Sequence, residues 1–406
     1  MRASALLIVL LWPVAAYSQI AGTANLGGQQ AMVSTPIPDS DFAAIAGKLG
    51  LALSSKPASE LIKGWRKPKK ILVAVDNNTN RLAWLQVAAP GVQLVPVHNK
   101  AEVLSQIADA DALIRLPCER DYLESGKMLH WIQQGSVSVA GCFQVAEHSD
   151  AVRGVPQALA DSSVVITNLS GVLARPLAEH AIAMMMTLGR GLDLYEKQQE
   201  QRHFLRDAVP PGRLWVFQGR TLLVVGLGAI GTNVAEIAHG LGMTVIATRN
   251  SGHQGPANVS YVGLADELPA LVGKADVVVL AAPLTPETRH LFDAVMFRRM
   301  KKGALLINVA SGGEVVSADL VDALKSGQLG GAGLDLADPA NPSALSASDP
   351  LFGAPNLIMT PETASHAVET PDASGGEDMW ALARENLRRY VAGEPLYAVV
   401  DPKRGY

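Results

Sequence analysis

The stretch Leu222-Leu-Val-Val-Gly226-Leu-Gly228-Ala-Ile-Gly231 joins a short apolar run to a glycine-rich turn. Residues 222–225 have the character of a buried strand, and residues 232–239 that of a helix. In such a unit the first glycine allows the tight turn, the second lets the backbone approach a pyrophosphate, and the third lets helix pack on strand. The free N–H groups at the start of the helix suit an anion. The stretch therefore predicts a dinucleotide-binding unit; the alternative is a glycine turn kept only for packing.

The end of the next strand in such a unit contacts the adenosine ribose. An acidic residue there would bind the ribose hydroxyls of NAD, but this chain has Thr248-Arg249-Asn250. A cation and two small polar groups suit a 2′-phosphate, which favours NADP over NAD. The alternative is that Arg249 is only an exposed, solvated arginine.

Apolar runs on both sides of this stretch predict further parallel strands, because short β-branched runs alternate with helical segments. After the glycine turn they lie at 244–247, 277–281, 304–309 and 356–360, and before it at 70–75, 93–97, 112–115, 131–133 (leading to 136–139) and 164–168. Helical spacing of apolar residues predicts helices at 39–54, at 102–108, from Pro176 onwards and at 378–391. The fold class is therefore α/β, with two parallel sheets.

Composition agrees with this class. The chain has 406 residues, of which 48% are apolar and only 5% aromatic, and 37 are glycine. This length suits two domains with additional segments. The net charge is −4 and no block of like charges occurs, so neither nucleic acid nor an anionic membrane is an expected partner.

The first 18 residues predict a secretory signal peptide. Arg2 precedes an apolar run from Ala5 to Ala16, and Ala16-Tyr17-Ser18 offers the small residues that a signal peptidase recognises. The alternative is an uncleaved anchor, although the run is shorter than the roughly 20 residues needed to span a bilayer. We therefore expect a periplasmic or secreted protein, with no stable membrane insertion after cleavage.

Several motifs within residues 69–406 resemble those of the D-isomer-specific 2-hydroxyacid dehydrogenases. Besides the glycine turn they are Thr167-Asn-Leu-Ser-Gly171, Pro176-Leu-Ala-Glu-His180, Ala282-Pro-Leu-Thr-Pro-Glu-Thr288, Ile307-Asn-Val-Ala310, Gly331-Ala-Gly-Leu-Asp335 and Glu385-Asn-Leu-Arg-Arg-Tyr390. The tail Ala392-Gly-Glu-Pro395 with Val399-Val-Asp-Pro402 also fits.

The resemblance implies two Rossmann-like, doubly wound parallel-sheet domains. An NAD(P)-binding domain (175–361) is inserted into a flavodoxin-like substrate domain (69–174 and 362–406), and the active site is the cleft between them. Residues 19–68 are then an N-terminal extension. The family also implies a homodimer formed through the nucleotide domain, with residues 176–198 involved.

The glycine turn, the triplet after the second strand and the resemblance together give the expected cofactor contacts. These are Gly226, Gly228, Ala229, Ile230, Gly231, Thr248, Arg249, Asn250, Pro283, Thr288, Val309 and Asp335. The expected cofactor is NADP or NAD, and no metal site is expected. The expected substrate is a small 2-keto or 2-hydroxy acid.

The reaction of the family needs a cation for the substrate carboxylate, an acid/base for the hydroxyl proton, and a carboxylate that orients the acid/base. The family uses Arg, His and Glu. At the matching positions this chain has Ser311, Glu362 and Ala340, with Asp338 the nearest acid to the last. The carboxylate-binding loop is also altered, because Ser136-Val-Ser138 stands where a glycine-rich turn is expected.

A displaced catalytic set is one interpretation of these changes. His366 lies four residues after Glu362, so the two could share a proton across one helical turn, and Arg115 or Arg120 could hold the substrate carboxylate. The alternatives are that His366 only lies near a helix start and that both arginines are solvated. His180 and Glu179 match the family helix and are expected to be structural.

Two functions therefore remain open at this point. The first is an NAD(P)-dependent reductase of 2-keto acids that uses Glu362, His366 and a displaced arginine. The second is an inactive, exported ligand-binding protein on the dehydrogenase fold, because soluble nicotinamide cofactors are not expected outside the cytoplasm.

The two cysteines, Cys118 and Cys142, follow neighbouring strands of the first predicted sheet. A disulfide between them would close a loop of about 25 residues and add roughly 3 kcal/mol in the chain-entropy model. The alternative is a pair of buried thiols.

Overall fold

The computed structural model describes residues 42–75, 79–137, 139, 164–210, 212–335, 345–365 and 374–401. The expected signal peptide, Ser138, Cys142, Asp338 and His366 lie outside these residues. Within them, no helix combines the length and the apolar character that crossing a bilayer requires.

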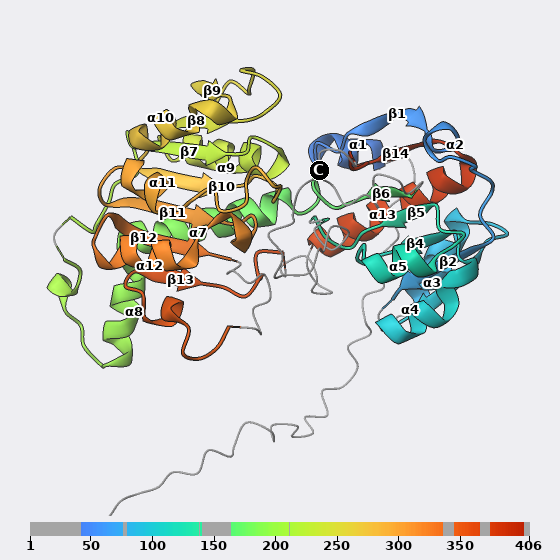
Figure 1. Ribbon diagram of the computed structural model, residues 1–406, viewed down its shortest axis with the longest axis horizontal. Helices are drawn as coiled ribbons and strands as arrows, with labels where there is room; N and C mark the ends of the chain where they lie inside the picture. Colours follow the sequence, from blue (N-terminus) through green and yellow to red (C-terminus); the bar gives the residue numbers. More distant parts are fainter. Residues whose placement is uncertain are drawn as a thin grey trace, which may run out of the picture. The chain divides into compact units, whose positions relative to one another are not determined.

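The larger sheet has seven parallel strands in the order β13-β12-β11-β10-β7-β8-β9 (Figure 1). Counted along the chain from β7, the first six strands follow the order 3-2-1-4-5-6 of a dinucleotide-binding Rossmann sheet. The strands are β7 Thr221–Val225, β8 Thr244–Thr248, β9 Tyr261–Gly263, β10 Val277–Leu280, β11 Ala304–Asn308, β12 Leu329–Leu334 and β13 Leu357–Met359.

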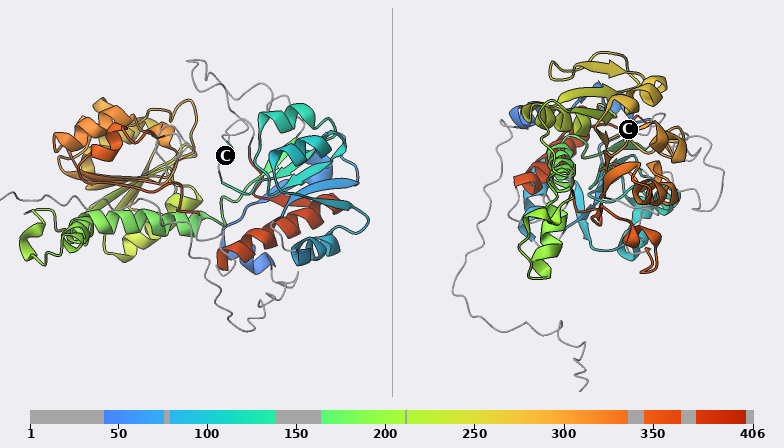
Figure 2. Two further views of the ribbon diagram at one scale, coloured as in Figure 1. Left: turned by 90° about the horizontal axis from the view of Figure 1, so that it is seen from below. Right: turned by 90° about the vertical axis from the view of Figure 1, so that its left-hand side faces the viewer.

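Helices cover both faces of this sheet (Figure 2). Alternate residues of β7 point to opposite faces. Leu222 and Val224 pack with α7 and α9, whereas Leu223 and Val225 pack with α10, α11 and α12. The helices are α7 Ala174–Arg190, α8 Leu192–Glu200, α9 Ala229–Gly240, α10 Leu268–Leu271, α11 Ala294–Arg299 and α12 Ser317–Lys325, with 3-10 turns at Arg206–Ala208, Ala265–Glu267, Val272–Lys274, Gly312–Glu314 and Pro350–Gly353.

The smaller sheet has five parallel strands in the order β3-β2-β4-β5-β6. This is the 2-1-3-4-5 order of a flavodoxin-like sheet, so the predicted fold class is confirmed for both sheets. The strands are β2 Lys70–Ala74, β3 Gln93–Val97, β4 Ala112–Ile114, β5 Trp131–Gln133 and β6 Val165–Thr167, and the helices are α3 Thr79–Ala88, α4 Lys100–Gln106 (continued by a 3-10 turn, Ile107–Asp109) and α5 Arg120–Ser125.

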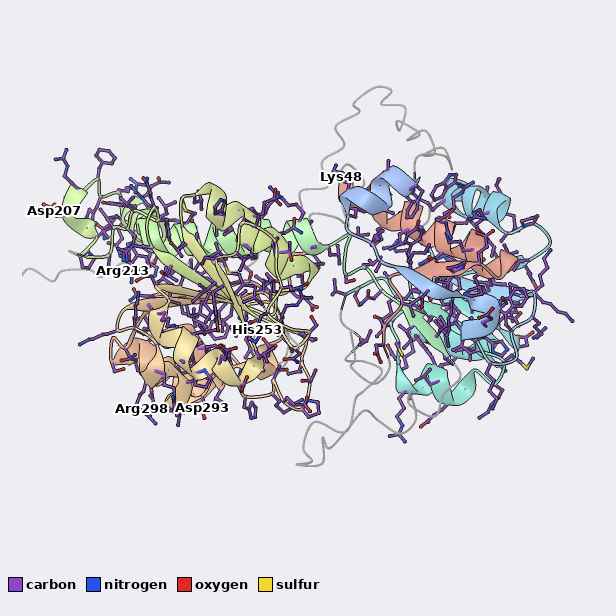
Figure 3. All side chains as sticks on the ribbon, turned by 90° about the horizontal axis from the view of Figure 1, so that it is seen from above. Lys48, Asp207, Arg213, His253, Asp293 and Arg298 are labelled. Atoms are coloured by element: carbon purple, nitrogen blue, oxygen red, sulfur yellow. The ribbon has the colours of Figure 1, made fainter. Side chains whose placement is uncertain are left out.

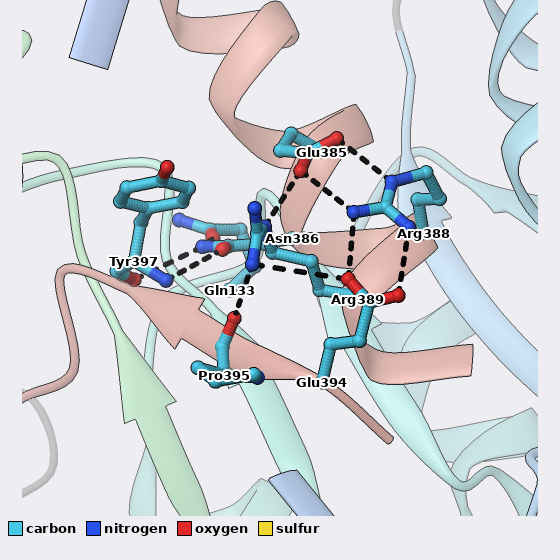
Figure 4. Close-up of polar contacts among 8 residues, drawn as sticks. All are labelled: Gln133, Glu385, Asn386, Arg388, Arg389, Glu394, Pro395 and Tyr397. Atoms are coloured by element: carbon cyan, nitrogen blue, oxygen red, sulfur yellow. Dashed lines mark hydrogen bonds and ion pairs between the residues drawn. The ribbon is translucent and has the colours of Figure 1, made fainter. Parts of the chain in front are cut away.

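The last helix, α13 (Ser374–Ala392), packs on this smaller sheet. Asn386 Nδ2 donates to Gln133 Oε1 of β5 at 2.8 Å, and Tyr397 N donates to Asn386 Oδ1 at 2.9 Å (Figure 4). The rings of Trp131 and Tyr390 lie 4.8 Å apart. The C-terminal part of the chain therefore completes the domain that the N-terminal part begins.

Some predicted boundaries were wrong, and glycine explains two of them. The helix predicted over 39–54 ends at Lys48 (α1, Phe42–Lys48), with Gly50 in the left-handed region at φ 62°. The long helix from Pro176 ends at Arg190, because Gly191 also has φ 62°, and α8 follows as a separate helix. In addition, the strand at 131–133 does not continue to 139, since β5 ends at Gln133.

Four strands were not predicted. β1 (Leu53–Pro57) pairs antiparallel with β14 (Pro395–Tyr397), and a short helix, α2 (Ala58–Leu61), follows β1. β9 and β12 belong to the larger sheet. The sequence of β12, Leu-Gly-Gly-Ala-Gly-Leu, has little strand propensity, yet a Cβ atom at Gly333 would lie 2.8 Å from Met184 Sδ. The glycines therefore let α7 pack closely on this strand.

Candidate functional site

The turn after β7 requires glycine at its first position. Gly226 has φ 97°, and a Cβ atom there would lie 2.6 Å from Cα and N of Ala282. The amides of Gly226 and Leu227 both donate to the carbonyl of Thr248, at 3.1 and 3.0 Å. The turn is therefore fixed against the ends of β10 and β8.

The other two glycines of the turn differ from each other in their surroundings. A Cβ atom at Gly231 would lie 2.2 Å from the carbonyl oxygen of Gly226, so this position serves close packing of α9. A Cβ atom at Gly228 would meet no heavy atom within 4 Å. Gly228 precedes Ala229 at the start of α9, and none of the described side chains caps this helix. Open space beside uncapped N–H groups fits the diphosphate of a dinucleotide.

Arg249 lies just after β8 and keeps an unused donor. Its Nη1 donates to the carbonyl of Gln254 at 3.1 Å, while its Nε is buried without a hydrogen-bond partner in the described part of the chain. Thr248 is buried and Asn250 is exposed. His253, labelled in Figure 3, has its Nδ1 2.8 Å from the carbonyl oxygen of Val262. An orphaned guanidinium N–H beside this strand end suits a phosphate oxygen.

The loops after β10 and β11 are ordered by their own side chains. Thr288 Oγ1 donates to the carbonyl of Pro283 and accepts from the amide of Thr285, both at 2.7 Å. Its hydroxyl is therefore used inside the loop. Val309 is buried against the α7 and α9 face of the sheet.

Ser311 is a short neutral residue in a fixed loop. Asn308 Nδ2 donates to the carbonyl of Ser311 at 2.8 Å, and Asn308 Oδ1 accepts from the amide of Ala310 at 2.9 Å. The backbone is thus held in place at the position where the family resemblance implies an arginine, but no cation is present at that position.

Glu314, which belongs to none of the predicted site residues, is a buried acid in the next turn. It is 1% exposed, and neither carboxylate oxygen has a hydrogen-bond partner within the described residues. Burial raises the pKa of its carboxyl from 4.5 to about 8. A charged residue between Gly313 and Val315 could have been noticed in the sequence, but its burial could not.

Asp335 is the centre of a hydrogen-bond network at the ends of β12 and β13. Its Oδ1 accepts from Thr360 Oγ1 at 2.7 Å and from the amide of Thr363 at 2.9 Å, and its carboxylate also accepts from the amide of Ala364 at 3.2 Å. The family resemblance implies that the Asp335 carboxylate contacts the cofactor. In the structure these hydrogen bonds hold the loop 360–364 in place.

His180 joins this network from α7. Its Nε2 lies 2.9 Å from Thr360 Oγ1 and 3.5 Å from Asp335 Oδ1. Thr360 has one hydroxyl proton, which it gives to Asp335, so His180 Nε2 is the donor in the contact with Thr360. Glu179, on the same helix, is exposed and pairs with Arg175 at 2.8 Å.

Glu362 is carried by the loop that Asp335 holds. Its amide donates to the carbonyl of Asp335, at 2.6 Å between nitrogen and oxygen. Glu362 is exposed and has φ 57°, a strained backbone for a residue other than glycine. The structure therefore brings together Asp335, Thr360, His180 and Glu362.

The two candidate arginines of the smaller sheet differ. Arg120 is exposed on α5 and pairs with Glu124 at 2.6 Å, one helical turn away. Arg115 follows β4 with φ 60°, and its guanidinium carbon lies 4.4 Å from the ring centroid of Trp380. Of the two, Arg115 is the cation at a strand end.

The loop after β5 lies next to Arg115. A Cβ atom at Gly135 would be 3.2 Å from the carbonyl oxygen of Arg115. The carbonyls of Ser136 and Val137 accept from Leu169 N at 3.1 Å and Asn168 Nδ2 at 2.9 Å. Cys118, a little further along the chain than Arg115, is buried and disulfide-bonded; the only other cysteine in the sequence is Cys142, which lies outside the described residues.

Comparison with known proteins adds three similarities. A sequence model for the NAD binding domain of D-isomer specific 2-hydroxyacid dehydrogenases matches residues 182–364. A D-lactate dehydrogenase of Streptococcus pyogenes is 31% identical over 240 residues, which cover 56% of this chain and 72% of the relative. A glyoxylate reductase of Korarchaeum cryptofilum is 29% identical over 338 residues, 80% of this chain and 91% of the relative.

A solved structure is also similar along most of its length. A crystal structure of a D-isomer specific 2-hydroxyacid dehydrogenase family protein from Aeromonas salmonicida has a TM-score of 0.67 and 29% identity. The match covers 82% of this chain and 99% of that one.

Proposed function

Because the chain belongs to the family of D-isomer specific 2-hydroxyacid dehydrogenases, we propose that it binds NAD(P) and interconverts a 2-keto acid and a 2-hydroxy acid. The turn at Gly226–Gly231 is the observation that carries this proposal. It combines the obligatory glycine at Gly226 with open space at Gly228 and an uncapped helix start. When bound, the nicotinamide would supply or accept the hydride.

Two residues of the chain are proposed to bind the substrate and to transfer its proton. Arg115 binds the substrate carboxylate, and Glu362 exchanges a proton with the substrate oxygen. Each follows the carboxyl end of a strand, where ligands bind in open α/β sheets, and each is held on a left-handed backbone. Such strain in residues other than glycine is concentrated at functional sites.

The test is NADPH oxidation in the presence of glyoxylate and hydroxypyruvate, which are named in the activities of relatives. We expect Glu362→Gln to lower kcat by about 10²- to 10⁴-fold, the usual contribution of a positioned acid/base. Glu60→Gln, which changes an exposed acid on α2, is the matched control and should keep the native rate. Equal rates for native and Glu362→Gln protein would remove Glu362 from the mechanism.

The second candidate function is dinucleotide binding without this chemistry. Ser311 favours it, because the loop is fixed by Asn308 yet offers no cation where the family has one. In that case NADPH binds and no 2-keto acid is reduced, whichever variant is tested.

We propose that the protein prefers NADP to NAD. This proposal rests on Arg249, because its buried Nε has no acceptor within the described residues. Arg249 also follows β8, at the strand end where the adenosine ribose binds. No acidic residue accompanies it in the triplet 248–250. A 2′-phosphate would offer this donor a charged acceptor, whereas the ribose hydroxyls of NAD would offer it only a neutral one.

We also propose that the protein is a homodimer formed through the segment 192–216. Five large apolar side chains are exposed on it: Leu192, Phe204, Leu205, Leu214 and Val216. Asp207 and Arg213, labelled in Figure 3, mark this end of the domain. A cluster of this kind on one short segment indicates an interaction surface.

Phe204→Asp is expected to convert the dimer to a monomer, because it places a charge on the fully exposed ring position of this surface. Light scattering of the native protein should give about twice the mass of one chain. Val87→Asp, an exposed position on α3, is the control and should remain dimeric. A native protein of single-chain mass would reject the dimer.

Export remains a proposal that rests on residues 2–18 of the sequence. N-terminal sequencing of the protein from intact cells should begin at Gln19. A chain that begins at Met1 or Arg2 would reject it.

A further inference from the structure

Glu314 is an acid whose surroundings do not suit a negative charge. Only 1% of the residue is exposed, and neither carboxylate oxygen has a hydrogen-bond partner among the residues that the structure describes. Burying an ionised carboxylate without a partner costs far more than burying a neutral acid, because the lost hydration is not replaced. The Glu314 side chain is therefore stable in its buried position only while it carries a proton.

The charged and titratable groups on the neighbouring elements do not offset this cost. Arg289 and His290, in the loop after β10, are both exposed. Asp293 and Asp319 accept backbone hydrogen bonds at the start of α11. Burial is what raises the pKa of Glu314, and no charged group within the described part of the chain contributes to this shift. An ionised Glu314 therefore has to leave its position to reach water.

The backbone of Glu314 joins two loops of the larger sheet. Its carbonyl accepts from the amide of Phe292 at 2.9 Å, and the carbonyl of Gly313 accepts from the amide of His290 at 2.8 Å. The amide of Val316 donates to the carbonyl of Phe292 at 3.0 Å. The loops after β10 and β11 are thus held together at the turn that ends with Glu314.

The same bonds hold the loop after β10 in a strained conformation. His290 has φ 54°, a left-handed backbone that is unfavourable for a residue other than glycine. Its hydrogen bond to Gly313 keeps it in this conformation. Opening of the turn would relieve the strain, which lowers the cost of opening.

Both loops carry positions that are expected to contact the cofactor. Pro283 and Thr288 belong to the loop after β10, and Val309 starts the loop after β11. Ligands of open α/β sheets bind at the carboxyl ends of the strands, where these loops lie. A change in the turn at Glu314 is therefore expected to reach the cofactor site through backbone hydrogen bonds.

We propose that Glu314 is a pH-sensitive switch that controls how tightly the two loops bind NAD(P). In the protonated form the side chain stays buried and the turn is closed. In the ionised form, after the proton has passed to water, the side chain leaves the interior and the bonds of the turn to His290 and Phe292 break. The effect on NAD(P) rests on the proposed function, whereas the opening of the turn does not.

The experiment is amide hydrogen exchange of the full chain without nucleotide, between about pH 7 and 9.5, followed by mass spectrometry. Because the pKa of Glu314 is raised to about 8, the closed form is preferred below this pH and is lost above it. Protection of the segment 288–292, relative to its intrinsic exchange rate, should therefore fall by about tenfold per pH unit above 8, since one proton is released.

Three variants serve this experiment. Glu314→Gln does not titrate at this position and should keep constant protection over the whole range. Glu314→Leu should do the same, which decides the matter if the glutamine variant does not fold. Glu287→Gln changes an exposed acid in the loop after β10 and should follow the native chain.

A calorimetric titration of NADPH over the same range tests the effect on the cofactor. Native affinity should fall by up to about tenfold per pH unit above 8, and that of Glu314→Gln should stay constant. Equal protection in native and Glu314→Gln protein at every pH would overturn the switch, and pH-dependent protection with unchanged NADPH affinity would overturn its coupling to the cofactor. If NADPH binds at no pH while protection still depends on Glu314, the switch stands and the proposed function fails.

Discussion

Replacing Glu314 with leucine is expected to stabilise the protein by several kcal/mol at pH 8. Glu314 is 1% exposed, and both of its carboxylate oxygens lack a partner within the described residues. A neutral acid buried in this way already costs about 1–3 kcal/mol, and ionisation costs more. Leucine has a similar size and needs no hydrogen bond.

The stability of the native protein should depend on pH in a definite direction. Burial raises the pKa of Glu314 from 4.5 to about 8, so in this range the folded protein keeps a proton that the unfolded chain has lost. Stability therefore falls as the pH rises from about 4.5 to 8 and then levels off. The ceiling of this loss is about 5 kcal/mol, because one pKa unit corresponds to about 1.4 kcal/mol.

Urea unfolding from pH 5 to 9 measures this effect. Glu314→Gln retains an unpartnered polar group that does not titrate. Its stability should therefore lose the pH dependence due to this site, but it should increase less than that of Glu314→Leu. Glu287→Gln changes an exposed acid in the neighbouring loop and should follow the native profile. Parallel profiles for native and Glu314→Gln protein would show that Glu314 is not buried as an acid.

The second large effect is expected at the glycine turn, where two alanine substitutions should separate folding from binding. Gly228→Ala places its methyl group in open space, so the free energy of unfolding should change by less than about 1 kcal/mol. The same methyl group occupies the place where a diphosphate approaches the backbone, and NADPH affinity should fall by at least about tenfold. Gly226→Ala has both a strained φ and a backbone clash, and should destabilise the fold by several kcal/mol.

Gly240→Ala is the matched control for this pair. It lies at the other end of α9, where a Cβ atom also meets nothing within 4 Å. It should leave NADPH affinity unchanged. Thermal unfolding and calorimetry on the same samples test the prediction, which fails if Gly228→Ala binds NADPH as tightly as the native chain.

The parallel sheets could be predicted because most of their strands are buried apolar runs. Residues 222–225 and 304–309 match β7 and β11 within one residue at each end. β12 could not be found this way, because three of its six residues are glycines required by contacts such as that of Met184 with Gly333. β1 and β14 were missed because strand pairing between distant short segments leaves no local pattern.

Only part of the candidate site could be predicted from the sequence. The glycine turn could be predicted from the sequence, because Gly226 and Gly231 each meet a steric requirement and Gly228 has open space beside it. The role of Asp335 could not be predicted, because its partners Thr360, Thr363 and Ala364 come from a separate segment that only folding brings near. The same holds for Trp380 and Arg115, whose contact joins a C-terminal helix to an early strand.

A nicotinamide dinucleotide is expected to bind this chain at Gly226–Gly231. The most direct test is a calorimetric titration of the purified protein, and of its Arg249→Leu variant, with NADPH and NADH. We expect NADPH to bind with micromolar affinity and more tightly than NADH, and this preference to be lost in Arg249→Leu. No binding of either nucleotide to the native chain would contradict this expectation and would leave the glycine turn as a packing feature alone.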